Sequence, residues 1–473
     1  MQYPTLLEYM KAIQNAGVNL DKLAHLSVVL DGQGEPCHIS GDSSVVFKMQ
    51  DKTTGKCYAL KCFTKAQKGC ADASSNSSSV KFLEKELLVL SQGKEEKYPV
   101  LLMDWVDGDS LGACQLKVED MSTVATKAEL NEAITDEFGV KYSKDGRKLL
   151  KVPQKLKGTY SIKEGTKIIC NMVFSECDSL SSVVIPDGVA VIGNNAFSYC
   201  ESLKSIIIPD SVTSIGESAF EGCSSLKSLV IPDSVTSIDT LAFCYCSSLK
   251  SLVIPDGVTS IGDGAFCTCE SLTSIVIPGG VTSIEKMAFS GCKSLKSIVI
   301  PDGVTSIGSG AFCGCESLMS IVIPDSVTCI GNRAFEFCFS LKSLVLSKSL
   351  TSIGDWAFNM AESLESLVIP DSVTSIGDYA FSSCRSLKSL VISNSVTHIA
   401  VGAFLSCTSL SSVVIPDGVT RIGEGAFIGC ESLKCIVIPD GVVSIEKDAF
   451  RDCNFPNDFK QELISRFGDK IFG

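Results

Sequence analysis

The chain has 473 residues, a formal net charge of −13 and only two tryptophans. This length exceeds one ordinary globular core and fits either about three domains or one elongated repeat array. The acidic balance would repel a phosphate backbone, so nucleic acid is excluded as a partner class.

The start of the chain carries no targeting pattern. Met1–Pro4 lacks the basic start and the apolar core of a signal peptide, and no stretch approaches about 18 consecutive apolar residues. We therefore expect a cytoplasmic chain with no membrane partner. The 23 cysteines are spread along the chain, mostly at one repeated position, which is typical of buried thiols in a reducing compartment.

Residues 1–118 show a hairpin pattern. Two strand-like runs, Ser44–Met49 and Lys56–Phe63, flank a turn at Asp51–Gly55. The pair resembles the second and third strands of a protein-kinase small lobe, with Lys61 in the place of the lysine that contacts the ATP phosphates, and Tyr98–Val106 resembles the strand before the hinge. The resemblance implies a small α+β domain with a nucleotide site.

This segment departs from the kinase pattern at the catalytic positions. Gly41 alone remains of the glycine-rich loop, Ala71–Ser79 resembles a loop where a helix is expected, and Val80–Leu90 favours a fourth strand. No His-Arg-Asp and no Asp-Phe-Gly follows, so phosphoryl transfer is excluded. We predict a truncated docking or folding unit; residual nucleotide binding at Gly41 and Lys61 stays open.

Gly108–Gly112 matches the G-x-S-x-G motif of hydrolases. Of the three histidines in the chain, only His398 follows Ser110, and it lies within the repeats described next. The motif therefore lacks a nearby base, and we predict no catalytic residue, no cofactor and no enzymatic activity.

A 23-residue repeat dominates the rest of the chain. A cysteine stands three residues after each repeated phenylalanine, except at Ala361, and a leucine stands six residues after it until Pro456. The thirteen phenylalanines are Phe174, Phe197, Phe220, Phe243, Phe266, Phe289, Phe312, Phe335, Phe358, Phe381, Phe404, Phe427 and Phe450. An exact period of this kind predicts stacked, nearly identical coils.

One coil illustrates the physical basis. Leu226–Ile231 has the L-x-x-L-x-L spacing of a leucine-rich-repeat strand, and Pro232 with Asp233 ends it in a turn. Eight side chains are expected to point inward: Leu226, Leu229, Ile231, Val235, Ile238, Ala242, Phe243 and Cys246. A single coil cannot bury them, so coils must stack at about 4.8 Å.

This pattern resembles the BspA-type leucine-rich repeat, and the resemblance implies a binding scaffold. We expect an α/β repeat solenoid of leucine-rich-repeat type, rich in β-structure, with about thirteen coils over residues 159–453. Residues 119–158 are interpreted as a linker and N-terminal cap, with Tyr160, Ile162 and Ile168 in the core of a degenerate first coil. In residues 454–473, Phe459, Leu463 and Phe467 share one helix face, which predicts a C-terminal capping helix.

The outward strand positions predict a binding surface. A row of β-branched residues is expected on the concave face: Ile207, Val230, Val253, Val276, Val299, Val322, Val345, Val368, Val391, Val414 and Val437. Beside it runs a row of lysines, Lys204, Lys227, Lys250, Lys296, Lys342, Lys388 and Lys434, on every second coil from Lys250 onward. The alternative is that valine merely suits a strand, whichever way it faces.

Two other rows have structural explanations. The Cys-x-Cys pairs that begin at Cys244, Cys267 and Cys313 could gather thiols for zinc, but one cysteine of each pair is a core position. Aspartates follow most strand prolines, as at Asp233, and turn capping explains them better than a calcium site does. We therefore predict no metal site.

Two functions remain open. The first is a non-enzymatic scaffold that binds protein along the concave face, with a glycan as the other ligand class. The second is a regulatory pseudokinase that selects its partner with the solenoid. The uniform outward rows favour a repetitive or extended partner bound by many equivalent contacts. The sequence predicts no oligomeric state.

Overall fold

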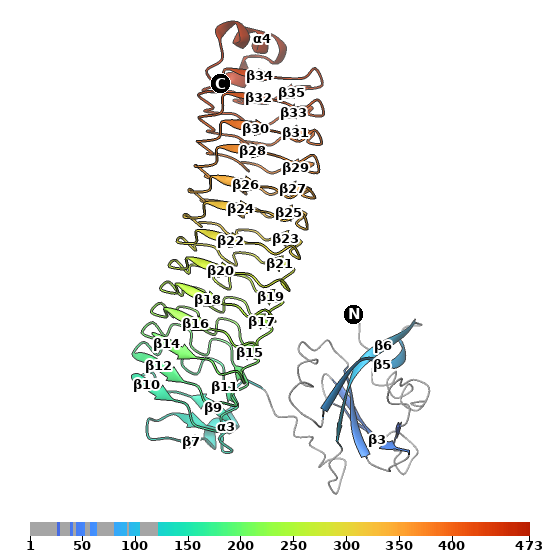
Figure 1. Cartoon of the computed structure of the whole chain (residues 1–473), viewed down its shortest axis with the longest axis vertical. Coiled ribbons are helices and arrows are strands. Elements are labelled where there is room, and N and C mark those ends of the chain that lie inside the picture. Colours follow the sequence, from blue (N-terminus) through green and yellow to red (C-terminus); the bar gives the residue numbers. More distant parts are fainter. Residues whose placement is uncertain are drawn as a thin grey trace. The chain divides into compact units, whose positions relative to one another are not determined.

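The computed structural model describes residues 26–28, 38–40, 44–52, 57–63, 80–91, 94–104 and 122–473 (Figure 1). Contacts divide the chain into two units, Met1–Asp120 and Met121–Gly473. Several features of the sequence analysis lie outside the described residues: Met1–Pro4, Gly41, the loop-like segment Ala71–Ser79, the Gly108–Gly112 motif, and parts of Asp51–Gly55 and Tyr98–Val106.

The described part of the first unit forms a six-stranded sheet in the order β1-β3-β4-β6-β5, with β2 paired to β3. Its strands are β1 Leu26–Val28, β2 His38–Ser40, β3 Ser44–Asp51, β4 Cys57–Phe63, β5 Val80–Ser91 and β6 Lys94–Asp104. β3 and β4 pair antiparallel with Phe47 opposite Leu60, both fully buried, which confirms the predicted hairpin. β5 confirms the strand expected from Val80.

The second unit begins with a short helix and an antiparallel meander. These elements are α3 Lys127–Asn131, β7 Ile134–Thr135, β8 Lys141–Tyr142 and β9 Lys148–Lys151. Thr126 and Glu129 form a reciprocal capping box on α3. Because β9 pairs in parallel with β11 (Ile168–Ile169), the meander extends one sheet of the solenoid beyond its first coil and covers the sheet edge there.

Every later coil adds one rung to each of two parallel ladders (Figure 1). The first ladder contains β10 Gly158–Ser161, β12 Leu180–Val184, β14 Ser205–Ile207, β16 Ser228–Val230, β18 Ser251–Val253, β20 Ser274–Val276, β22 Ser297–Val299, β24 Ser320–Val322, β26 Ser343–Val345, β28 Ser366–Val368, β30 Ser389–Val391, β32 Ser412–Val414 and β34 Cys435–Val437. The second contains β11, β13 Val191–Ile192, β15 Ser214–Ile215, β17 Ser237–Ile238, β19 Ser260–Ile261, β21 Ser283–Ile284, β23 Ser306–Ile307, β25 Cys329–Ile330, β27 Ser352–Ile353, β29 Ser375–Ile376, β31 His398–Ile399, β33 Arg421–Ile422 and β35 Ser444–Ile445. The predicted solenoid of about thirteen coils is confirmed.

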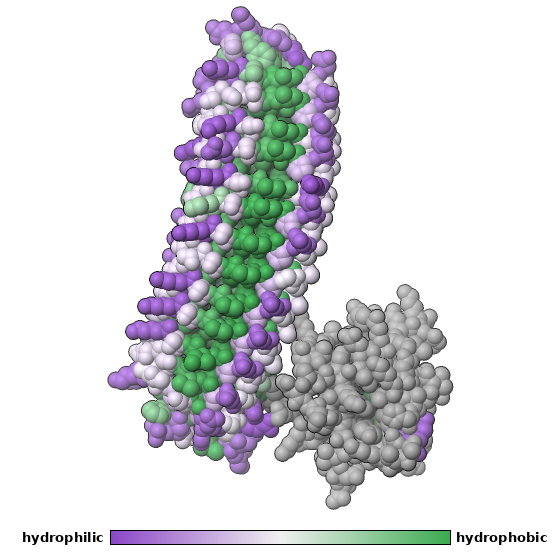
Figure 2. Space-filling view, in the orientation of Figure 1, coloured by the Kyte–Doolittle hydropathy of each residue, from purple (hydrophilic) through white to green (hydrophobic). Residues whose placement is uncertain are grey.

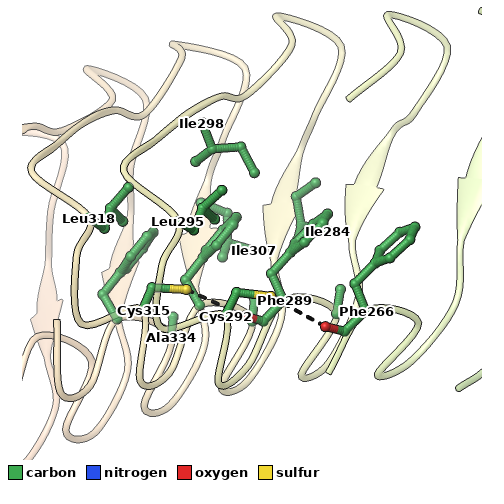
Figure 3. Close-up of a cluster of buried hydrophobic side chains, with 14 of the residues drawn as sticks. Phe266, Ile284, Phe289, Cys292, Leu295, Ile298, Ile307, Cys315, Leu318 and Ala334 are labelled. Atoms are coloured by element: carbon green, nitrogen blue, oxygen red, sulfur yellow. Dashed lines mark hydrogen bonds between the residues drawn. The ribbon is translucent and has the colours of Figure 1, made fainter. Parts of the chain in front are cut away.

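Repeated side chains fill the space between the ladders. All eight positions predicted to point inward in the coil that begins at Leu226 are buried. Consecutive rings of the phenylalanine row stack nearly parallel, with centroids 4.8 Å apart at Phe174–Phe197 and 5.9 Å apart at Phe381–Phe404. Figure 3 shows this packing in the middle of the solenoid. The core is thus one continuous column that no coil could form alone.

The cysteine row adds hydrogen bonds between coils. Each thiol from Cys200 to Cys453 donates to the carbonyl of the phenylalanine in the preceding coil, as Cys292 does to Phe266 at 3.3 Å and Cys315 to Phe289 at 3.3 Å (Figure 3). Ala361 interrupts the series. Burial raises the pKa of these thiols, that of Cys246 to about 12, so they remain protonated donors at neutral pH.

This burial predicts a selective alkylation pattern. In native protein at pH 8, iodoacetamide should label the exposed Cys435 and leave the buried row from Cys177 to Cys453 unmodified, because thiolate and access are both needed. Peptide mass spectrometry checks this, and the same reaction in urea should label every cysteine of the row. Rapid native labelling of Cys292 would contradict the packing.

Two left-handed residues per coil shape the turns between the ladders. They stand two residues before and two residues after each phenylalanine, as Leu241 (φ 55°) and Tyr245 (φ 59°) do around Phe243. These conformations are costly for residues other than glycine. In this conformation the amides of Leu241, Phe243 and Tyr245 all donate to carbonyls of the next coil at 2.8–2.9 Å. These hydrogen bonds satisfy backbone groups that lie outside the strands.

The C-terminal residues close the open end of the core. α4 spans Asn457–Phe467 and a short 3₁₀ helix spans Asp469–Phe472. Leu463 and Ile471 are buried, and the amide of Phe450 donates to the carbonyl of Ile471 at 2.8 Å. The predicted capping helix is confirmed, and its termination at Gly468, with φ 84°, fits a residue without a side chain.

Candidate binding surface

An apolar stripe runs along the outside of the first ladder. It consists of the eleven residues from Ile207 to Val437 that the sequence predicts as an outward row. Their exposed fractions range from 78% at Ile207 to 51% at Val345. Figure 2 shows this stripe in green along the length of the solenoid, with hydrophilic side chains on both sides.

The strand geometry explains why these side chains align. In β16 the central Leu229 points into the core while Ser228 and Val230 face outward. Parallel pairing without a register shift places Val230 beside Val253 and Val276 beside Val299. Neighbouring strands lie about 4.8 Å apart, so the valines form a contiguous surface.

The size of the stripe is unusual for a surface without a partner. A fully exposed valine side chain offers on the order of 100 Å², from its burial free energy and the coefficient per unit area. At the observed exposures, the eleven residues present on the order of 700 Å². The largest apolar patch of a typical monomer is about 300–600 Å².

A charged row borders each side of the stripe. The lysine row, Lys204 to Lys434, stands three residues before the stripe position of its coil, and an aspartate row stands three residues after it. The aspartates are Asp187, Asp210, Asp233, Asp256, Asp302, Asp325, Asp371, Asp417 and Asp440, and all are exposed. Of the lysine row, within the described residues, Lys388 alone forms an ion pair, with Glu365 at 3.3 Å.

Some aspartates also cap turns of the next coil. The Asp325 carboxylate accepts a hydrogen bond from the amide of Lys348 at 2.8 Å, and that of Asp371 accepts one from Asn394 at 3.4 Å. Throughout the residues that the structure describes, no group of three or more His, Cys, Asp or Glu could hold a metal ion.

The Cys-x-Cys positions lie inside the coils. Cys244 and Cys267 are 2% and 7% exposed, and Cys313 is half-buried. The interaction between the Cys244 and Cys267 side chains raises the pKa of Cys244 and lowers that of Cys267. The Cys267 thiol also lies within hydrogen-bond distance of the Thr268 hydroxyl, at 3.5 Å.

The nucleotide-site residues of the sequence analysis are only partly described. Lys61 lies on β4, opposite Val46 of β3 and Leu101 of β6. Its partner in the predicted site, Gly41, lies outside the described residues. In the described part of the chain, no helix is long and apolar enough to cross a membrane.

A coil of 23 residues with two parallel ladders and an exposed strand face defines a leucine-rich-repeat solenoid. The sequence matches the family model described as BspA type leucine rich repeat region over residues 166–296, 282–410 and 332–457. These segments cover more than half of the chain, and the chain belongs to this family. The resemblance inferred from the phenylalanine and cysteine rows is thereby confirmed for the repeats.

Solved structures of bacterial repeat proteins are similar to this chain. A leucine rich cell surface protein from Faecalibacterium prausnitzii is 31% identical, with coverage of 71% of this chain and 98% of that one and a TM-score of 0.47. A leucine-rich repeat protein from Bacteroides ovatus is 26% identical, with coverage of 72% and 96% and a TM-score of 0.47. A leucine rich repeat protein from T. pallidum is 30% identical, with coverage of 38% and 87% and a TM-score of 0.35. No curated protein matches the sequence.

Proposed function

We propose that this chain is a non-enzymatic interaction scaffold that binds a protein partner along the apolar stripe. The observation that carries the proposal is the unbroken exposure of eleven β-branched side chains in register. Burial of one such valine contributes about 1–2 kcal/mol at these exposures. Several rungs together therefore suffice for a stable complex.

The uniformity of the stripe favours an extended or repetitive partner. Each rung offers the same aliphatic side chain between a lysine position and an aspartate position, so a partner gains affinity by contacting many equivalent rungs. A glycan is less favoured, because the stripe carries no aromatic ring on which a sugar could stack.

A capture experiment with the full chain tests this proposal. The double variant Val299→Glu/Val345→Glu places two charges in the stripe and should reduce capture of the partner from a cell extract at least tenfold. Val443→Glu is the matched control, because Val443 is 80% exposed and lies outside the stripe. Equal capture by the parent and the double variant would overturn the proposal.

The second candidate is a regulatory pseudokinase with residual nucleotide binding at Gly41 and Lys61. The position of Lys61 on β4, between β3 and β6, supports it. Under the scaffold proposal, ATP should leave the thermal unfolding midpoint of the full chain unchanged. An ATP-dependent shift that Lys61→Ala abolishes would favour the pseudokinase instead.

The cytoplasmic compartment expected from the sequence is likewise a proposal. The burial of the cysteine row and its thiol-to-carbonyl hydrogen bonds support it, whereas the similar protein from F. prausnitzii is described as a cell surface protein. Alkylation of protein taken directly from cells, with reagent present at lysis, tests the redox state. Cysteines found in disulfides would contradict a reducing compartment.

A further inference from the structure

We propose that the protein bound along the apolar stripe is a second copy of this chain, held face to face and parallel, with each coil opposite its own equivalent. The inference rests on the proposed function, since it names the partner of the same surface. Two observations carry it: the arrangement of the charged rows about the stripe and the area of the stripe.

The two charged rows stand at equal sequence separations from the stripe. In β16 and its turn, Lys227 stands three residues before Val230 and Asp233 stands three residues after it. A two-fold axis parallel to the solenoid axis and centred on the stripe exchanges the two sides of the face. It therefore places each lysine position opposite the aspartate position of the same coil in the second copy, and each valine opposite its equivalent.

The sequence of the rows matches this arrangement coil by coil. Five coils carry both charges and would form opposite-charge pairs on each side of the axis: Lys204 with Asp210, Lys227 with Asp233, Lys250 with Asp256, Lys296 with Asp302, and Lys434 with Asp440. Four other coils of the stripe carry at most one charge at the two positions. They add no like-charge contact.

The two remaining coils are exceptions that compensate each other. Lys342 shares its coil with Lys348, and Glu365 shares the next coil with Asp371, so each coil alone would bring like charges together. Because these coils are neighbours, Lys342 of one copy lies one rung from Asp371 of the other. Lys348 likewise lies one rung from Glu365 of the other copy, and a rung is only about 4.8 Å.

The antiparallel alternative fails on charge. A two-fold axis across the face places the lysine row opposite the lysine row and the aspartate row opposite the aspartate row. Opposing like charges destabilise an interface and suppress that orientation. The parallel arrangement is the one that the charges favour.

The area fits a stable dimer. The stripe offers on the order of 700 Å² per copy from its valine exposures, and the charged rows would add to it. A standard protein interface buries about 800 Å² per partner. An apolar centre with a charged rim is also the usual composition of such an interface.

Sedimentation equilibrium of the full chain tests the association. At about 0.15 M salt, a physiological ionic strength, the parent should form a dimer. Val299→Glu/Val345→Glu should weaken the dimer at least tenfold while circular dichroism stays unchanged. Val443→Glu should dimerise like the parent. A monomeric parent, or a double variant that dimerises as tightly as the parent, would overturn the proposal.

Cysteine cross-linking tests the orientation. In a Cys435→Ser background, which restores the serine found at this position in most coils, Val230→Cys and Val414→Cys should each form a disulfide-linked dimer on mild oxidation. Val230 and Val414 lie near opposite ends of the stripe, so each can meet its own equivalent only in a parallel pair. Linkage only in a mixture of the two variants would indicate an antiparallel dimer and overturn the parallel arrangement.

The two proposals can fail separately. A monomeric parent that captures a different protein through the stripe would end the inference and leave the proposed function standing. A monomeric parent whose capture does not depend on the stripe would end both.

Discussion

Phe312→Ala should destabilise the solenoid more than any surface substitution, by about 3–5 kcal/mol. The Phe312 ring is fully buried and stacks on Phe289 at 5.5 Å and on Phe335 at 5.1 Å. Alanine would leave a cavity shared by three coils. Since each coil contacts only its neighbours, the loss cannot be spread along the array.

Urea unfolding followed by circular dichroism measures this effect. Phe337→Ala is the matched control, because Phe337 is 36% exposed and lies outside the phenylalanine row, in a turn of the neighbouring coil. Its substitution should cost less than about 1 kcal/mol. Equal unfolding midpoints for the two variants would show that the phenylalanine row is not the main support of the core.

Removal of one complete coil should leave the fold intact, whereas removal of half a coil should prevent folding. Deletion of Thr282–Val304 removes one repeat of 23 residues and joins Val281 to Thr305. The new junction is the same Val-Thr pair that Val304 and Thr305 form in the parent. β20 would then pair with β24 in the same register. Every core row would remain continuous.

Deletion of the twelve residues Thr282–Lys293 provides the contrast. It removes β21 and the ring of Phe289 but keeps β22, so one ladder and the phenylalanine row are interrupted. Soluble yield and the cooperativity of unfolding report the outcome. A half-coil deletion that folds as well as the full-coil deletion would contradict the role of exact stacking.

The sequence predicted the repeat core because each core position keeps the same kind of side chain along the chain. Leu226 and Phe243 recur with period 23, and both are buried as expected. The cap residue Leu463 could be predicted for a different reason, since the helical spacing from Phe459 to Phe467 is visible in a short segment.

The turns between the ladders were not predicted. Glycine occupies some of their left-handed positions, as at Gly264 and Gly314, but others carry residues as different as Leu241, Trp356 and Thr268, so glycine alone does not mark these turns. The coils impose the conformation, because the amides at these positions donate to the next coil. The hydrogen bond that the Cys292 thiol donates could not be predicted either, because the Phe266 carbonyl becomes its neighbour only when the coils stack.

The candidate surface was predicted in part. Alternation within each strand indicated that Val230 faces outward, and the exposure of 68% agrees. The aspartate row was interpreted from the sequence only as turn chemistry, because each aspartate was explained by its own turn and not by its place beside the valine that Lys227 and Asp233 flank at equal separation. The recurrence of lysine and aspartate on the same coils is the pattern from which a charged border on both sides of the valines could have been predicted.

The central claim is that the apolar stripe binds the partner, and stepwise loss of affinity tests it most directly. The dissociation constant for the partner captured by the parent chain should be measured with one, two and three substitutions, added in the order Val299→Glu, Val345→Glu and Val253→Glu. We predict that each step weakens binding about tenfold, the equivalent of about 1.4 kcal/mol per valine. An unchanged dissociation constant in a folded triple variant would contradict the claim.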